Sequence, residues 1–187
     1  MYSIIKRVLD VFFALLFITI LLPIYIIVPI IIFLQDRHNP VFKQKRIGKM
    51  GVEFMFYKFR SMPINTPDLE STKKEKLKVT PFGKIIRRTN IDELPQVFNV
   101  LKGDMSWIGP RPPIVSQKKL INLRRENNAL SMKPGLTGWA QINSYDNMSE
   151  EAKAKYDGVY AEKISLYMDF IIMMRTFKYV TKKPPIY

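Results

Sequence analysis

The longest hydrophobic stretch of the chain lies near the N-terminus. Val11–Leu34 contains no charged residue and consists mostly of Ile, Leu, Val and Phe. As a single helix it would extend about 36 Å, enough to cross a bilayer core of roughly 30 Å. It is too long for the apolar part of a cleaved signal peptide, and no small-residue cleavage site follows it. The pattern therefore predicts a membrane helix.

Two features favour a helix that enters the membrane and returns over one that spans it. Pro23 lies in the middle of the run and interrupts the helical hydrogen-bond ladder. Basic residues flank both ends, with Lys6 and Arg7 before the run and Arg37 after it, so both ends are expected on the cytoplasmic side. A bend at Pro23 would give arms of about 12 residues, each reaching roughly 18 Å. A straight spanning helix remains the alternative.

Beyond residue 36 the pattern becomes polar, basic and interrupted by turns. Val41–Ile47 and Val52–Arg60 are rich in β-branched and aromatic residues and flank a turn with Gly48 and Gly51, which predicts a β-hairpin. The segment 63–79 combines prolines, small polar residues and clustered charge, as is typical of an exposed loop.

Helical periodicity dominates the second half. Leu94, Val97, Phe98 and Leu101 follow the spacing of an amphipathic helix, and Gly103 is placed to end it. Four further helices are predicted: around 82–88, over 116–130, up to about 163, and from about 165. The last one contains Asp169 and is too short to span a bilayer, so it is expected at the membrane interface or in the core. The fold class is therefore mixed, α/β or α+β, with a small hairpin and interfacial helices.

Composition narrows the chemistry. The chain has 187 residues, which suit one domain with a membrane segment, and 30 Lys+Arg against 16 Asp+Glu. The net charge of +14 implies anionic partners: nucleic acid, acidic lipid or phosphorylated small molecules. The absence of cysteine excludes disulfides, thiol catalysis and cysteine zinc sites, and the single His38 argues against histidine chemistry. Catalysis would fall to carboxylates, hydroxyls or lysines.

A carboxylate pair lies in basic surroundings. Asp92 and Glu93 directly precede the predicted amphipathic helix, where Asp92 is expected as the N-cap with Pro95 in the first turn. Arg87 and Arg88 lie one turn upstream, and Arg111 follows the helix. Simple capping and matching of the helix dipole would explain the pair. The basic neighbours favour a nucleophilic or metal-binding role in Mg²⁺-assisted phosphoryl transfer.

These residues carry a family resemblance that runs nearly from end to end. The chain resembles the monotopic phosphoglycosyl transferases, also called the bacterial sugar transferase family. The block around Asp92 is the most specific, because no common structural constraint dictates so many consecutive residues. The matching segments are Lys6-Arg7 with Asp10, PVFKQKRIG at 40–48, KFRSM at 58–62, TPFGKIIRRTNIDELPQVFNVLKGDMSWIGPRP at 80–112, KPGLTGWAQIN at 133–143, and Tyr156-Asp157, Tyr160, Ser165 and Asp169.

The resemblance implies a fold and a reaction. Family members have a re-entrant membrane helix broken at a Ser-Pro pair, for which this chain has Leu22-Pro23. Their remaining fold is a small α/β globule with amphipathic helices in the cytoplasmic interface. The match makes Asp92 the nucleophile that attacks the β-phosphate of a UDP-sugar, releasing UMP. Polyprenyl phosphate would then take the sugar phosphate from Asp92. Mg²⁺ would bind at Asp92 and Glu93, and Glu93 would assist the metal or a proton transfer.

Further site residues follow from the same match. Arg88 and Arg111 are expected to contact phosphate, because guanidinium groups bind phosphate oxygens bidentately. The remaining substrate-binding candidates are Lys58, Arg60, Gln141 and Asp157, although a structural ion pair would explain Asp157 equally well. Many relatives continue the Gln141 segment with Asn-Gly-Arg, whereas this chain has 143–145 Asn-Ser-Tyr.

The prediction is thus a membrane-embedded segment, 1–36, and a catalytic domain, 37–187, on the cytoplasmic face of the bacterial inner membrane. The partners would be a UDP-sugar, polyprenyl (undecaprenyl) phosphate and membrane lipids, without nucleic acid; a homo-oligomer is left open. The alternative is a membrane-tethered protein that binds anionic lipid or nucleic acid. It explains the charge and the anchor but not a carboxylate pair among arginines, since carboxylates repel such ligands. A membrane scaffold would not explain the segment 137–141 (TGWAQ).

Overall fold

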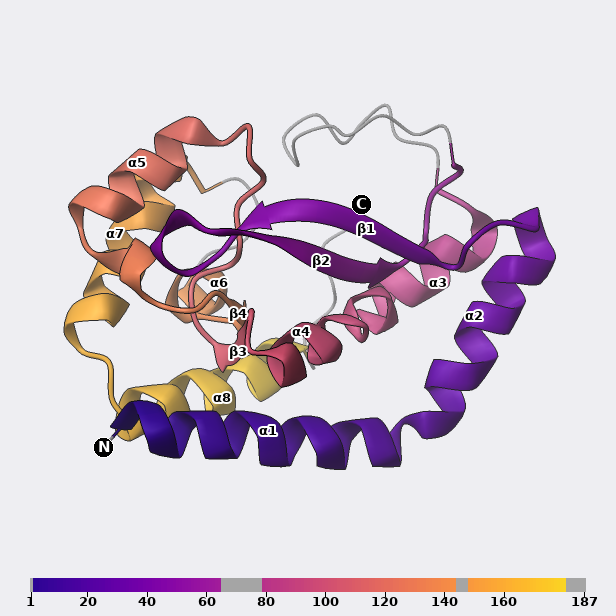
Figure 1. The fold of residues 1–187 in the computed structure, drawn as a ribbon, viewed down its shortest axis with the longest axis horizontal. Helices are drawn as coiled ribbons and strands as arrows, with labels where there is room; N and C mark the ends of the chain where they lie inside the picture. The colour runs from indigo at the N-terminus through magenta and orange to yellow at the C-terminus, as the bar shows by residue number, and fades with distance from the viewer. Residues whose placement is uncertain (1, 65–78, 144–147, 181–187) are drawn as a thin grey trace.

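The N-terminal apolar run forms two helices that meet at an angle. A computed structural model describes residues 2–64, 79–143 and 148–180. Helix α1 (Tyr2–Ile20) and helix α2 (Leu22–Asp36) are bent by 64° at their junction. Figure 1 shows α1 along the lower edge of the molecule and α2 along its right edge. Among the described residues no single helix is long and apolar enough to cross a membrane, whereas this bent pair together meets the requirement of length and composition.

The break lies at Leu21, two residues before the predicted position. Pro23 occupies the first turn of α2, where its missing N–H leaves no hydrogen bond unmade. The chain therefore breaks just before the proline, not at it. Pro29 lies inside α2 without ending the helix. The arms have 19 and 15 residues, longer than predicted, because α1 continues back to Tyr2 through its charged residues.

Each membrane-type helix has one packed face and one exposed apolar face. Ala14 of α1 is fully buried in a cluster with Val97, Val100 and Met105. Val28 and Ile32 of α2 belong to a second cluster. The opposite faces expose large apolar side chains, which suits contact with lipid tails: Ile4, Val8, Phe12, Leu15 and Ile20 of α1 and Leu22, Ile26, Ile27, Ile30 and Leu34 of α2.

Polar contacts also attach α1 to the rest of the chain. The Arg7 guanidinium donates to the carbonyls of Val100 (2.6 Å) and Leu101 (2.7 Å) near the end of the helix that follows the carboxylate pair. Asp10 is buried and accepts a hydrogen bond from the Trp107 N–H (3.0 Å). A cation at a helix C-terminus satisfies carbonyls that lack partners within the helix. The charged residues of α1 thus fix its position.

The predicted hairpin is confirmed. Strand β1 (Val41–Ile47) pairs with β2 (Glu53–Phe59) in antiparallel register, and the turn η1 (Lys49–Gly51) places Gly51 at φ +84°. A second, parallel pair consists of β3 (Ser106–Ile108) and β4 (Gly135–Thr137).

The remaining elements are short helices, and the mixed fold class is confirmed. Figure 1 shows α4 between α1 and the hairpin. Most of the predicted loop, residues 65–78, lies outside the described residues. The helices are α3 (Pro81–Arg88), η3 (Ile91–Glu93), α4 (Gln96–Lys102), α5 (Lys118–Glu126), η4 (Ala129–Ser131), α6 (Trp139–Asn143), α7 (Glu150–Glu162) and α8 (Leu166–Val180).

Helix α8 has the amphipathic character expected of an interfacial helix. Tyr167 and Phe170 are 75% and 60% exposed, whereas Asp169 and Ile172 are buried. The Asp169 carboxylate forms an ion pair with Lys6 of α1 (2.6 Å). Its location at a membrane surface stays a prediction.

Candidate active site

The carboxylate pair lies in a tight turn between two helices. Helix α3 ends after Arg88, and Asn90 adopts the left-handed conformation (φ 55°), which asparagine tolerates better than most residues. The 3-10 turn η3 follows and contains both carboxylates. Asp92 is therefore not the N-cap of α4, as the sequence suggested; Pro95 holds that position. The separate turn η3, which starts at Asn90, lies between α3 and α4 and contains Asp92.

A buried asparagine fixes this turn beside the hairpin. Asn99 of α4 is fully buried; its amide donates to the Met55 carbonyl (2.7 Å), and its side-chain oxygen accepts from the Tyr57 N–H (3.2 Å). These bonds attach α4 to the edge of β2. Because Lys58 follows Tyr57 in the strand, the same contact places the lysine beside the carboxylate pair.

Glu93 is held by two cations. The Lys58 ammonium lies 2.7 Å from Glu93 Oε1, and Arg111 Nη2 lies 2.6 Å from the same oxygen. A second nitrogen of Arg111, Nη1, reaches Glu93 Oε2 at 3.4 Å. Such two-point contacts between guanidinium and carboxylate fix orientation as well as charge. Glu93 is consequently an ionised, oriented carboxylate.

Asp92 has different surroundings, so the two carboxyl groups differ in their contacts and in the direction of their pKa shifts. It is only 6% exposed, and the Lys58 ammonium lies 3.7 Å from its Oδ2. Burial raises the pKa of Asp92, and Lys58 opposes this only in part. Burial also acts on Glu93, but Arg111 and Lys58 hold the pKa of Glu93 well below its usual range. Asp92 is thus the carboxylate with the less engaged, more basic oxygens.

Arg87 lies in the site, although the sequence indicated it only as a basic neighbour of the carboxylate pair and not as a substrate-binding residue. Its Nε donates to the Ser61 hydroxyl oxygen (2.8 Å), and its charge lowers the pKa of Asp92. Arg88, which was selected, is exposed at the last position of α3. A helical projection could have separated them, since Arg87 follows the buried Ile86 and lies nearer the packed side of α3.

Three further predicted residues make other contacts. Arg60 follows β2, and its main-chain N–H donates to the Pro40 carbonyl (2.8 Å). Gln141 donates to the Leu136 carbonyl (3.3 Å), while its side-chain oxygen is buried without a hydrogen-bond partner. Asp157 is buried in α7 and pairs with Arg124. Residues 144 and 145, where the sequence departs from many relatives, lie outside the described residues.

The carboxylates of this site fit Mg²⁺ only as a source of a single protein ligand. Among the described residues there is no group of three or more His, Cys, Asp or Glu side chains placed to hold a metal ion. Mg²⁺ is commonly bound by one or two carboxylates together with water and substrate phosphates. Asp92 could supply such a ligand, whereas both oxygens of Glu93 already accept from cations. The described residues of this site therefore do not surround a metal ion on their own, and water and substrate phosphates would complete its coordination.

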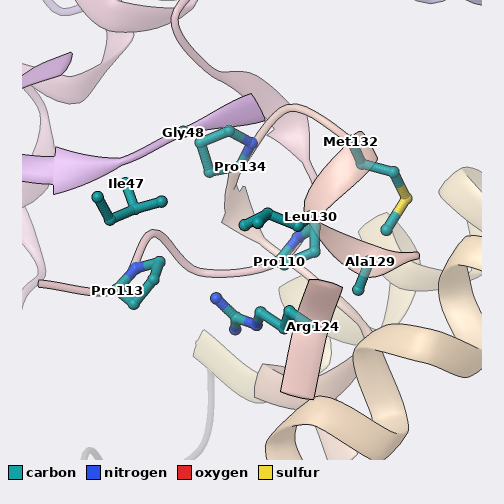
Figure 2. A pocket seen from close by; sticks show the side chains of 9 residues that line it. All are labelled: Ile47, Gly48, Pro110, Pro113, Arg124, Ala129, Leu130, Met132 and Pro134. Atoms are coloured by element: carbon teal, nitrogen blue, oxygen red, sulfur yellow. The ribbon is translucent and has the colours of Figure 1, made fainter. Parts of the chain in front are cut away.

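A small pocket lies elsewhere, and neither carboxylate of the pair lines it. Figure 2 shows its lining, with the Arg124 guanidinium on the Pro113 side. The other lining residues are Ile47, Gly48, Pro110, Ala129, Leu130, Met132 and Pro134.

The geometry defines a class of site: a buried carboxylate beside an oriented one, with basic side chains around both. The turn that carries the pair packs against α2 through Ile91 and Leu94. The model of one protein family, described as bacterial sugar transferase, matches residues 1–183. The chain belongs to this bacterial sugar transferase family, which confirms the resemblance inferred from the sequence.

Curated relatives support the same assignment. The chain is 35% identical over 187 residues to a UDP-N-acetylgalactosamine-undecaprenyl-phosphate N-acetylgalactosaminephosphotransferase of Aeromonas hydrophila, covering 95% of this chain and 44% of the relative. It is 39% identical over 163 residues to the galactosyl transferase CpsE of Streptococcus agalactiae serotype III (strain NEM316), covering 78% and 35%. It is 38% identical over 151 residues to a UDP-glucose:undecaprenyl-phosphate glucose-1-phosphate transferase of Xanthomonas campestris pv. campestris, covering 74% and 31%. The chain spans less than half the length of each of these relatives.

Proposed function

We propose that the chain is a phosphoglycosyl transferase that moves a sugar 1-phosphate from a UDP-sugar to undecaprenyl phosphate and releases UMP. The observation that carries the proposal is the pairing of a buried, weakly engaged Asp92 with a Glu93 clamped by Lys58 and Arg111. Named relatives act on UDP-sugars and undecaprenyl phosphate, which supports the substrates.

The proposed reaction has two displacements at one phosphorus atom. In the first, an Asp92 oxygen attacks the β-phosphorus, the bond from that phosphorus to the bridging oxygen breaks, and UMP leaves with the bond's electron pair. The product is an acyl phosphate that carries the sugar. In the second, a phosphate oxygen of undecaprenyl phosphate attacks the same phosphorus and the Asp92 carboxylate leaves. A covalent route needs neither histidine nor cysteine.

The neighbouring side chains have separate tasks in this scheme. Burial leaves Asp92 poorly solvated and therefore more nucleophilic, and Lys58 keeps enough positive charge nearby for the carboxylate to ionise. Arg111 is half in solvent and presents its guanidinium beside Glu93, where it can also bind a phosphate oxygen. When bound at Asp92, Mg²⁺ would neutralise charge on the diphosphate.

The test is UMP release by the purified protein in detergent or nanodiscs. The assay contains Mg²⁺, undecaprenyl phosphate and a panel of UDP-galactose, UDP-glucose and UDP-N-acetylgalactosamine, the sugars named for relatives. We expect release with at least one donor and formation of a polyprenyl diphosphate-sugar. Saturable binding of anionic lipid without UMP release from any donor would favour the membrane-tethered binding protein instead.

We also propose that both ends of the α1–α2 pair face the cytoplasm. The chain has no cysteine, so Ser3→Cys and Asn39→Cys each introduce a single thiol at an exposed position. Ser3 lies in the first turn of α1, and Asn39 follows the end of α2. In inside-out vesicles both thiols should react with a membrane-impermeant maleimide, and in right-side-out vesicles neither should. The bent geometry and the basic residues at both ends support this result.

The two single-thiol proteins control for each other, because the proposed topology requires both thiols to react, or both to stay unreacted, in vesicles of one orientation. Reaction of Ser3→Cys and Asn39→Cys in opposite vesicle orientations would mean that the pair spans the bilayer as a kinked helix. The catalytic proposal would survive that result, but the proposed topology would not.

A further inference from the structure

The segment 110–113 consists of three prolines and Arg111. Proline has no backbone N–H, so three of the four residues cannot donate a main-chain hydrogen bond. Apart from the Arg111 N–H, the main chain of this segment can form hydrogen bonds only through its carbonyl oxygens. The position of Arg111, whose side chain reaches Glu93, therefore depends on what binds those oxygens.

Every carbonyl of this segment accepts a hydrogen bond from a different residue. Two donors are main-chain N–H groups and two are arginine side chains. The contacts are Gly135 N to Pro110 O (3.0 Å), Arg124 Nη1 to Arg111 O (2.8 Å), Arg46 Nη1 to Pro112 O (3.2 Å) and Ile47 N to Pro113 O (3.0 Å).

The donor to Arg111 is itself fixed by a buried ion pair. Arg124 lies on α5 and is only 3% exposed. Its Nε and Nη2 lie 2.9 Å and 2.6 Å from Asp157 Oδ2, which is 1% exposed, so the remaining nitrogen, Nη1, is directed at the Arg111 carbonyl. A guanidinium is planar and rigid, so fixing two nitrogens also fixes the third. In Figure 2 this group lies on the Pro113 side of the pocket.

We propose that Arg124 is a positioning residue for the reaction: oriented by Asp157, it holds the backbone of Arg111 so that the Arg111 side chain meets Glu93. The inference rests on the proposed function. It assigns Asp157 an indirect role in the site, through Arg124 and Arg111, in place of contact with the substrate. The three coplanar nitrogens of the Arg124 guanidinium suit this bridge between Asp157 of α7 and the proline segment.

The test compares Arg124→Lys with Arg125→Lys. Lysine at 124 keeps a positive charge beside Asp157 but cannot bind both the carboxylate and the Arg111 carbonyl. Arg125 is the exposed neighbour on α5 and contacts Asn122 (3.1 Å), so its replacement controls for the chemistry of the substitution. Leu120→Ala, at a buried position of the same helix, serves as a reference for lost stability alone.

Two readouts are needed. Hydrogen exchange is measured on the peptide 108–115, in which only Arg111 and Ile114 of the segment 110–114 carry a backbone N–H. We expect faster exchange in Arg124→Lys than in either control. In the UMP assay we expect about a tenfold loss of kcat/KM, because a displaced Arg111 no longer meets Glu93 in the same geometry.

The outcomes separate the two proposals. If the hydrogen-exchange rate of peptide 108–115 is unchanged in folded Arg124→Lys, the positioning role is wrong. It is also wrong if Leu120→Ala, at an equal loss of thermal stability, increases that rate as much as Arg124→Lys does. If Arg124→Lys does not fold, Asp157→Glu is used, since it keeps the ion pair but displaces Arg124, and the same criteria apply. Absence of UMP release from the unmodified protein would contradict the proposed function, while the exchange readout would still decide whether Arg124 fixes Arg111.

Discussion

Asp92→Asn is expected to lower UMP release by about a thousandfold or more, because an amide oxygen is a poor nucleophile and carries no charge. Asparagine has nearly the shape of aspartate, so the buried site can accept it without a cavity. Removing a carboxylate whose burial raises its pKa also removes a desolvation penalty, so the folded state should not be weakened. Initial rates of UMP release at saturating donor measure the effect.

Asp104→Asn is the matched control, because Asp104 lies past the other end of α4 and its contact to Asn99 (3.3 Å) survives as an amide hydrogen bond. Intact-protein mass after incubation with donor, without acceptor, adds a direct readout. The unmodified chain and Asp104→Asn should gain the mass of a sugar phosphate, and Asp92→Asn should not. Release of UMP by Asp92→Asn at the unmodified rate would mean that the covalent mechanism is wrong.

Lys58→Met should lower activity near neutral pH by about a hundredfold and restore part of it at higher pH. Asp92 must be ionised to attack phosphorus, and its pKa is already raised by burial. Lys58 is the cation that most lowers that pKa, so its loss raises the pKa further. As pH falls through the higher pKa, the variant loses its nucleophile earlier. The acidic limb of the pH–rate profile should therefore move to higher pH.

Lys45→Met controls for charge on the hairpin, since Lys45 pairs with Glu53 at an exposed position (3.1 Å) and faces neither carboxylate. Its pH–rate profile should match that of the unmodified chain. A Lys58→Met profile of unchanged shape, with a higher KM for donor at every pH, would contradict tuning of Asp92. That result would instead assign Lys58 a direct contact with the substrate.

The sequence predicted the elements whose causes are local. Hydrophobic composition and length defined the bent membrane-type pair, and the β-branched strands around Gly48 and Gly51 defined the hairpin. The break was misplaced because Pro23 marks the first turn of a new helix as readily as the end of an old one. The N-cap was misplaced because the left-handed Asn90 starts a separate turn, which periodicity does not reveal.

The sequence predicted those parts of the site whose residues are adjacent in the chain or match the family, but not the contacts that depend on tertiary packing. Asp92 and Glu93 are adjacent in sequence, so the pattern shows them together, and the family resemblance added Lys58 and Arg111, which the structure brings to Glu93. Arg124 carries no sequence signal, because its partners Asp157 and the Arg111 carbonyl are distant along the chain. Contacts of that kind come from tertiary packing alone. The roles of these residues stay proposals.

The inner face of α1 shares its core with the elements that carry the carboxylate pair. Ala14 packs with Val97 and Val100 of α4, and Arg7 binds the carbonyls near the end of that helix. A version trimmed to residues 37–187 for solubility would consequently expose the underside of α4 and leave those carbonyls to water. The α1–α2 pair therefore supports the fold around the proposed active site, so the smallest unit worth purifying includes it, with lipid or detergent around its apolar face.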